Sequence, residues 1–318
     1  MVPRHLGRTT AVAERILDRD IVRPFYLERT HLRGRFVRLE ETVHYVLTAH
    51  AYPEPVSRLL AELLVLAGSF VGALKFTGTF SLQIRSEGAI RLMVVDVTND
   101  GVMRGYASFD EEAFTGEQGG ETKRLFADAV LAITVDQRKA GGQMQQGIVR
   151  IDGRTPSEAL LVYFRQSEQI PTALRTAVGR DPLTGHWRAA GILLQAMPGE
   201  VAEEPEERRE DWHRAMLLLQ TVTEEELLGD GLTPDEVLFR LFHEEGVRVF
   251  EAMPISPGCS CDRERVRTML RQFPAAELEA MRQEDGSIGV TCQFCSRHYL
   301  FEAGEVDGLV AERSGSAR

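Results

Sequence analysis

Four cysteines near the C-terminal end are the residues of this chain best suited to chemistry. Cys259 and Cys261 form a C-x-C pair, Cys292 and Cys295 form a C-x-x-C pair, and the chain has no further cysteine. Two short pairs joined by a longer loop are the usual spacing of a tetrahedral zinc site, and four thiolates complete its coordination. The pattern predicts one Zn²⁺ per chain in the reduced form, bound by these four residues.

His298 is the alternative ligand, since it follows Cys295 by three residues. Because four cysteines already fill a tetrahedral site, the interpretation of His298 as an ordinary hairpin side chain is favoured. A zinc ion held by four thiolates has no open position for substrate or for an activated water. The cluster is therefore expected to have no catalytic residue.

The same spacing allows redox chemistry. Residues two or three positions apart can bring their Cα atoms within the ~4.4–6.8 Å range of disulfides, so each pair could close on itself when oxidised. Closing both pairs would destroy the zinc site, and loss of the metal should unfold a domain of about sixty residues. Three arginines at positions 263, 265 and 267 lie close to the C-x-C pair and would favour thiolates. For the arginines alone, an exposed helix face is the favoured interpretation.

Composition and charge exclude several classes of function. The 318 residues suit about two domains, and the formal net charge of −11 opposes binding to nucleic acid. The first twenty residues carry charges throughout and lack an apolar signal region, and the most apolar run (63–74) is shorter than the ~20 residues of a membrane span. We therefore expect a cytoplasmic protein without a membrane partner, in which paired cysteines indicate metal or redox chemistry.

The remaining sequence predicts an α+β fold whose core domain, residues 1–198, is a mixed sheet with helices packed against it. Residues 1 to about 35 are expected to be an extension that leads into a strand at 34–39. Helical spacing follows, and from residue 75 the period changes to two, which indicates a meandering sheet. The expected helices are 40–53, a buried helix from Pro55, and 157–169 capped by Ser157; the expected strands are three within 75–109, then 129–137, 143–152 and 186–198.

The next segment, residues 199–254, is predicted to be a charged helical linker. Its first fourteen residues carry seven acidic and two basic side chains. A helix is expected over 211–222, and a second begins at Thr233 with a capping box. The linker is either a packed subdomain or an arm whose apolar face can be uncovered. The apolar candidates on it are Met216, Leu217, Leu218, Val237, Leu238, Leu241 and Phe242.

Residues 255–318 form the expected zinc domain, with short helices at 264–273 and 274–283. The segment 287–301 is predicted to be a hairpin with the C-x-x-C at its tip. No nucleophile elbow, H-E-x-x-H or deaminase motif is present, so no enzyme is predicted. His243-Glu244-Glu245 lacks a second histidine at helical spacing and is better interpreted as a helix end.

Almost the whole chain resembles the heat-shock protein 33 family of redox-regulated molecular chaperones. The motifs that carry the resemblance are LLAELLVLAG, LKFTGTFSLQIRSEGAIRLMVVD, MRGYA, QGIV, YFRQSEQIPTAL, GILLQAMP, EVLFRLFHEEGVRVF, CSCDRER and CQFCSRHYLF. The C-x-C and C-x-x-C pairs are the signature of that family. The first fifteen or so residues lie outside the resemblance.

The resemblance implies a chaperone that is inactive while reduced and zinc-bound. Peroxide or hypochlorite would oxidise Cys292 and Cys295 first and release the metal, and a Cys259–Cys261 disulfide would follow. The zinc domain and linker would then unfold and expose apolar surface that binds unfolding client proteins, without ATP and as a homodimer. The absence of a G-x-x-x-x-G-K-[ST] motif agrees with ATP independence. The alternative hypothesis is a zinc-ribbon module that binds proteins or nucleic acid and has no chaperone activity.

Overall fold

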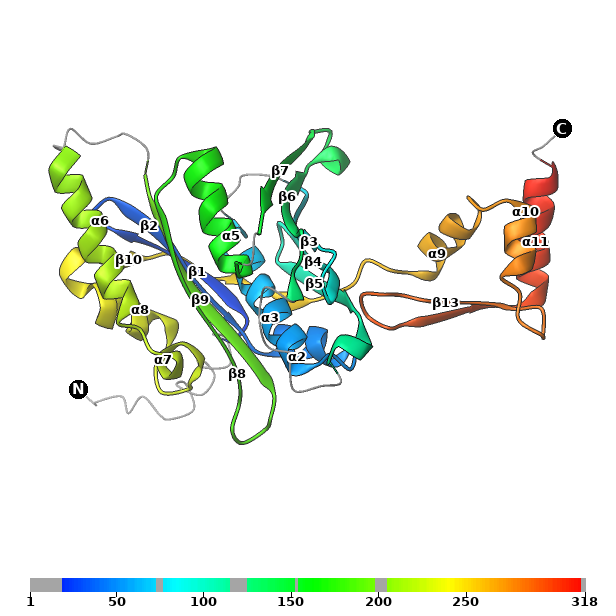
Figure 1. Ribbon diagram of the computed structural model, residues 1–318, viewed down its shortest axis with the longest axis horizontal. Coiled ribbons are helices and arrows are strands. Elements are labelled where there is room, and N and C mark those ends of the chain that lie inside the picture. The colour runs from blue at the N-terminus through cyan, green and yellow to red at the C-terminus, as the bar shows by residue number, and fades with distance from the viewer. Residues whose placement is uncertain (1–18, 73–76, 115–124, 152–153, 198–204, 316–318) are drawn as a thin grey trace, which may run out of the picture. The chain divides into compact units, whose positions relative to one another are not determined.

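Two mixed sheets with helices between and beside them make up most of the chain, which confirms the predicted α+β class (Figure 1). The computed structural model describes residues 19–72, 77–114, 125–151, 154–197 and 205–315. The chain separates into two units, Met1–Pro257 and Gly258–Arg318. Each unit has its own hydrophobic core.

The first sheet, sheet A, has the strand order β10-β1-β2-β9-β8, with β11 paired to β1. Side chains of β2 and β9 are buried almost without interruption, because both faces of the sheet are covered. Its strands are β1 (Ile21–Leu27), β2 (Leu32–Leu39), β8 (Thr172–Arg180), β9 (Trp187–Ala196), β10 (Val247–Val249) and β11 (Met253–Pro254).

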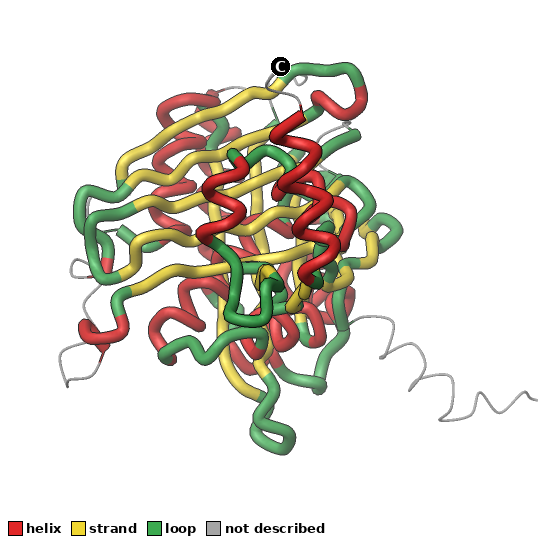
Figure 2. The backbone as a smooth tube through the Cα atoms, turned by 90° about the vertical axis from the view of Figure 1, so that its right-hand side faces the viewer, coloured by secondary structure: helices red, strands yellow, loops and turns green. Residues whose placement is uncertain are grey.

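The second sheet, sheet B, has the order β12-β5-β4-β3-β6-β7, and its strands lie side by side in one layer (Figure 2). Burial alternates along β3 and β4, as expected for a sheet with one covered face. The strands are β3 (Thr79–Arg85), β4 (Ile90–Thr98), β5 (Val102–Phe109), β6 (Val130–Asp136), β7 (Met144–Arg150) and β12 (Ser256–Pro257).

Helices α2 (Glu41–Thr48), α3 (Glu54–Gly68) and α5 (Pro156–Tyr163) pack beside these sheets. The predicted central helix is α3, which is buried on nearly every side and contacts strands of both sheets. A single apolar cluster joins α3 to the inner face of sheet A, through Val37 and Leu39, and to sheet B. This cluster is the main core of the first unit.

The outer face of sheet A is covered by α6 (Pro205–Gln220), α7 (Glu224–Leu228) and α8 (Pro234–Phe242), which we call the arm (Figure 1). The predicted capping box of α8 is present, and α7 has a second one formed by Thr223 and Glu226. Phe25 and Phe36 of the sheet pack against Val237, Leu241 and the other apolar side chains of the arm. In this structure the arm is therefore packed against the sheet.

Several predictions of local structure were wrong. The N-terminal extension was expected to reach about residue 35, but Ile21–Leu27 is strand β1, paired with β2; the part of the expected extension before residue 19 lies outside the described residues. One meandering sheet was expected, and the strands instead form two sheets. Strand β8 was not predicted, and α6 begins at Pro205, earlier than the expected residue 211.

Helix α5 also differs from its prediction. Thr155, not Ser157, caps it, and the regular helix ends at Tyr163, before a wider turn over residues 164–168. Ser157 instead donates from its backbone N–H to the Glu62 carboxylate at 2.9 Å, and its hydroxyl contacts the same oxygen. Thr155 takes the cap because its extended backbone lets the side chain reach the N–H of Glu158.

The second unit contains α9 (Arg263–Leu270), α10 (Ala275–Ala280), the hairpin β13 (Ile288–Thr291) and β14 (His298–Phe301), and α11 (Ala303–Gly315). The two short helices and the hairpin with the C-x-x-C at its tip were predicted correctly. Helix α11 was not predicted. The division into core 1–198, linker 199–254 and zinc domain 255–318 stays a prediction.

Candidate metal centre

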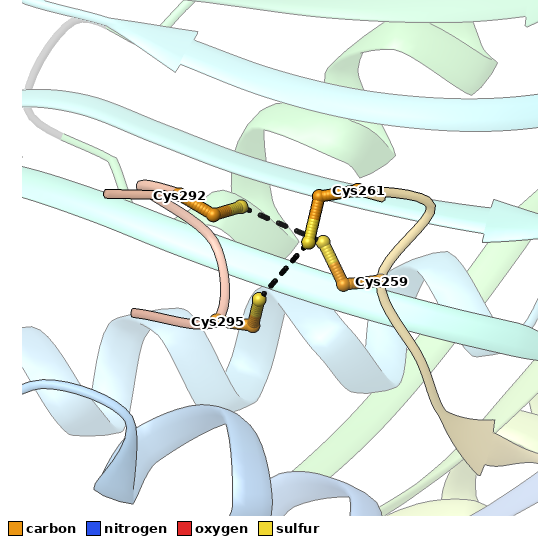
Figure 3. A group of neighbouring side chains, drawn as sticks. All are labelled: Cys259, Cys261, Cys292 and Cys295. Carbon is orange, nitrogen blue, oxygen red and sulfur yellow. Dashed lines mark hydrogen bonds between the residues drawn. The ribbon is translucent and has the colours of Figure 1, made fainter. Parts of the chain in front are cut away.

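The four cysteine side chains converge on one point, although their two pairs come from different parts of the second unit (Figure 3). Cys259 and Cys261 lie in the loop before α9, while Cys292 and Cys295 lie in the turn between β13 and β14. Their sulfur atoms all lie within 4.8 Å of one another. The folding of the hairpin against α9 therefore brings together two pairs that are thirty residues apart in the sequence.

The sulfur geometry fits a tetrahedral metal. The Sγ atoms of Cys259 and Cys292 are 3.7 Å apart, and those of Cys261 and Cys295 are 3.3 Å apart. A tetrahedral site with Zn–S bonds of ~2.3 Å has sulfur–sulfur edges of ~3.8 Å. These four residues form a cluster that could bind a metal, and their all-sulfur character favours zinc among divalent ions.

Backbone hydrogen bonds shape the C-x-x-C turn. The N–H of Cys292 donates to the carbonyl oxygen of Arg297 at 2.9 Å, and the N–H of Ser296 donates to that of Cys292 at 2.9 Å. Ser296 has a φ of 56°, in the left-handed region. This tight turn directs both cysteine side chains to the same side of the hairpin tip, as Figure 3 shows.

His298 lies outside this group of ligand atoms. Its Nδ1 is 3.1 Å from the hydroxyl of Thr291 across the hairpin, in the pair that closes the β13–β14 ladder. The histidine thus occupies the hairpin position that the sequence favoured for it.

The thiols of the cluster differ in acidity. Burial raises the pKa of Cys259, and burial together with neighbouring thiols raises the pKa of Cys295 to about 12. Burial opposes ionisation of Cys261 as well, but hydrogen bonds from the Tyr299 hydroxyl and the nearby thiols lower its pKa to about 7. Cys261 is therefore the thiol that this environment most favours as a thiolate.

The arginines beside the C-x-C pair have carboxylate partners. Arg263 and Arg267 of α9 form ion pairs with Glu305 of α11 at 2.6 and 2.7 Å, and Arg265 pairs with Asp262 at 3.4 Å. Arg263 also stacks over the Phe301 ring at 4.6 Å. Their main contribution is to join α9 to α11, a helix that the sequence reasoning missed, and not to surround the thiolates with positive charge.

The apolar candidates on the arm have different exposures. Val237, Leu238, Leu241 and Phe242 of α8 are all buried, none more than 3% exposed. On α6, by contrast, Leu217 is 51% exposed, while its neighbours at 216 and 218 are half-buried. The structure brings the α8 residues together with the outer face of sheet A, so they contact a client only if the arm leaves that face.

Two arginines of sheet A hold the connection between α7 and α8, and the sequence reasoning did not identify them. Arg38 of β2 donates to the carbonyl oxygens of residues 226, 227 and 232 at 3.1–3.2 Å. Arg188 of β9 donates to the carbonyl oxygen of Leu228 and pairs with Asp230, both at 2.9 Å. Arginines inside an otherwise apolar strand were the available signal, since a buried arginine needs partners.

Comparison with known proteins gives a consistent result. The family described as "Hsp33 protein" matches residues 20–302. The 33 kDa chaperonin of Pseudomonas aeruginosa (strain LESB58) is 42% identical over 289 residues, which cover 90% of this chain and 93% of the relative. That of Ectopseudomonas mendocina (strain ymp) is 38% identical over 299 residues, covering 94% and 97%. The crystal structure of the 33 kDa chaperonin of Thermotoga maritima, a heat shock protein 33 homolog, superimposes with a TM-score of 0.78 at 25% identity, over 93% of this chain and 99% of that one.

Among the helices in the described ranges, none combines the length and the apolar character that crossing a membrane requires.

Proposed function

This chain belongs to the Hsp33 family, and on that basis we propose that it is a redox-regulated, ATP-independent holdase chaperone switched by its C-terminal zinc site. The observation that carries the proposal is the cluster of four cysteine sulfurs within 4.8 Å of one another. Its relatives are named as chaperonins, in agreement with the prediction that the chain is not an enzyme. The partners are unfolding proteins, which follows from membership in a chaperone family.

In the reduced state, Cys259, Cys261, Cys292 and Cys295 would hold one Zn²⁺, whose binding energy stabilises the second unit. The apolar core of that unit is small, consisting of eight buried side chains from α9, α10, the hairpin and α11. A domain of this size rarely folds stably without a metal or disulfide. The zinc ion would therefore be needed for the folded state of residues 258–315.

In the oxidised state, Cys292 with Cys295 and Cys259 with Cys261 would form two disulfides. For each disulfide two thiolates lose two electrons, and one hydrogen peroxide takes up those electrons with two protons and leaves as two waters. The metal loses its ligands and is released. All six sulfur–sulfur edges of a tetrahedron are similar in length, so this pairing rests on the family resemblance and on the sequence spacing.

Exposure of the client-binding surface would follow from unfolding of the second unit and of the arm. The chain supports this coupling by its continuity, because β10, β11 and β12 lead directly into Cys259. Releasing the arm would uncover Val237, Leu238, Leu241 and Phe242 together with Phe25 and Phe36 beneath them. With Met216, Leu217 and Leu218 of α6, these form an adaptable apolar surface for varied clients.

One aggregation assay tests the proposal. Chemically unfolded citrate synthase is diluted into reduced protein or into peroxide-treated protein, while a chromogenic chelator reports zinc release. We expect the oxidised protein to suppress light scattering and the reduced protein not to. Equal scattering under both conditions would refute the chaperone proposal.

The zinc-ribbon alternative makes the opposite prediction: the reduced protein would bind RNA or DNA, and oxidation would bring no suppression of aggregation. The net charge of −11 counts against it. Dimerisation on activation is also part of the proposal, tested by light scattering of the oxidised protein after size-exclusion chromatography. A cytoplasmic location stays a prediction, which cell fractionation can check.

A further inference from the structure

We propose that the Tyr299 hydroxyl positions Cys261 and protects its sulfur from oxidants, so that the C-x-x-C pair reacts before the C-x-C pair. This inference rests on the proposed function, because it explains the order of oxidation in the proposed switch. It assigns a role to a residue that is not itself a metal ligand. The chemical class involved is a small electrophilic oxidant such as hydrogen peroxide.

Tyr299 is held in place by the core of the second unit. It lies on β14 opposite Val290 of β13, and only 8% of the residue is exposed. Its ring packs in the cluster that contains Val266 and Phe301, two further residues of that core. A ring fixed in this way gives its hydroxyl a defined direction.

That direction leads to the metal centre. The Tyr299 hydroxyl donates a hydrogen bond to the sulfur of Cys261 at 3.2 Å. Cys261 itself packs against the edge of the same apolar cluster. The hydroxyl therefore connects a ligand of the loop before α9 to strand β14, on the other side of the centre.

Such a hydrogen bond has two chemical consequences. Zinc with four thiolates carries a net charge of minus two, and a donor that withdraws electron density from a sulfur stabilises that charge. The same donor competes for the sulfur lone pair that attacks an oxidant. Oxidation begins when a thiolate attacks one oxygen of the peroxide, which forms a sulfenic acid and expels hydroxide. A second thiol then displaces water from the sulfenic sulfur to close the disulfide.

The position of the bond determines which pair is protected. Cys292 and Cys295 lie at the exposed tip of the hairpin, on a turn that only the metal and local backbone bonds constrain. Cys261 is instead tied to a buried tyrosine from a separate strand. The attack of Cys261 on peroxide requires that this bond break or weaken, so its reaction is slower.

The test compares Tyr299→Phe with Tyr163→Phe, in the full-length zinc-loaded protein. The first substitution removes the hydroxyl and keeps the buried ring, while the second removes a hydroxyl that bonds Glu168, far from the cysteines in the sequence. Limiting peroxide is added, free thiols are trapped with one alkylating reagent, and disulfides are labelled with a second after reduction. Mass spectrometry then gives the oxidation rate of each cysteine.

For Tyr299→Phe we expect the rate of Cys261 oxidation to rise several-fold relative to that of Cys292 and Cys295. We also expect zinc affinity, measured by competition with a chelator, to fall about 10-fold, which is typical for loss of a second-shell partner. The Tyr163→Phe control should match the wild type in both. An unchanged order of oxidation with unchanged zinc affinity would overturn the proposal.

A second variant guards against misfolding. Replacing Tyr299 by 3-fluorotyrosine leaves the ring in place and makes the hydroxyl a stronger donor, so Cys261 should oxidise more slowly than in the wild type. Faster or unchanged oxidation would contradict the role assigned to the hydroxyl. These readouts concern thiols and zinc alone, so they remain decisive even if the oxidised protein fails to suppress aggregation, a result that would refute the proposed function separately.

Discussion

Replacing Arg38 by methionine should loosen the arm while the rest of the first unit stays folded. The Arg38 side chain lies on the outer face of β2, and the residue is only 6% exposed. Its three guanidinium hydrogen bonds reach carbonyl oxygens at residues 226, 227 and 232, the end of α7 and the connection to α8. Methionine keeps the apolar stem and removes every donor.

The size of the effect follows from those three bonds. A hydrogen bond that involves a charged group contributes ~1.5–3 kcal/mol, but the removed guanidinium also recovers part of the cost of its burial. The net loss of arm docking is therefore expected to be ~2–4 kcal/mol. Since ~1.4 kcal/mol is a factor of ten in an equilibrium constant, the fraction of molecules with an open arm should rise about 30- to 700-fold.

Hydrogen exchange measures this fraction directly. Amides of α7 and α8 in the reduced protein should exchange faster by that factor, while amides of β2 and β9 keep their protection. The control is Arg58→Met, because Arg58 of α3 also donates to a carbonyl oxygen, that of Val178 at 2.8 Å, which belongs to β8 and not to the arm. Unchanged exchange in α7 and α8 of the Arg38 variant would refute the assignment of Arg38 to arm docking.

Three further outcomes are expected. Cys292→Ser should lose stoichiometric zinc and redox control, and a variant that still binds one zinc per chain in a metal assay contradicts the four-cysteine site. A strong chelator should remove protection from hydrogen exchange within residues 258–315 while α3 stays protected, and full protection after metal loss would show that zinc does not stabilise this unit. Burial raises the pKa of the Glu62 carboxyl above its ordinary 4.5, so its contribution to stability is present below pH 4.5 and is lost as the pH rises through the raised value. The unfolding free energy of the wild type relative to Glu62→Gln should therefore fall over that pH range, and a difference independent of pH, measured in urea, would exclude the effect.

Local sequence signals were sufficient for the cysteine cluster and for much of the secondary structure. The paired spacing of Cys259 with Cys261 and of Cys292 with Cys295 restricts each half-site to one short turn, so a four-sulfur centre could be predicted without the fold. Capping chemistry is local as well, which is why the start of α8 at Thr233 was predicted. Period-two patterning located β3, β4 and β5 for the same reason.

Contacts between distant segments depend on the tertiary structure, and those predictions failed or were missing. Strand β1 has few local signals, and its pairing with β2 and β10 makes it a strand. Whether the arm was packed or uncovered could not be decided from its composition. Packing against Phe25 and Phe36, together with donors from Arg38 and Arg188, answered that question for the folded state.

The sequence by itself thus determined the kind of metal centre and the residues that compose it, because ligand spacing is a property of short segments. The tertiary structure decided which groups surround that centre and which surface covers the arm. The hydrogen bond from Tyr299 to Cys261 joins residues 38 positions apart, and the bonds of Arg38 span about 190 positions. Neither distance has a periodicity that a sequence pattern could reveal, since both arise only when separate elements pack together.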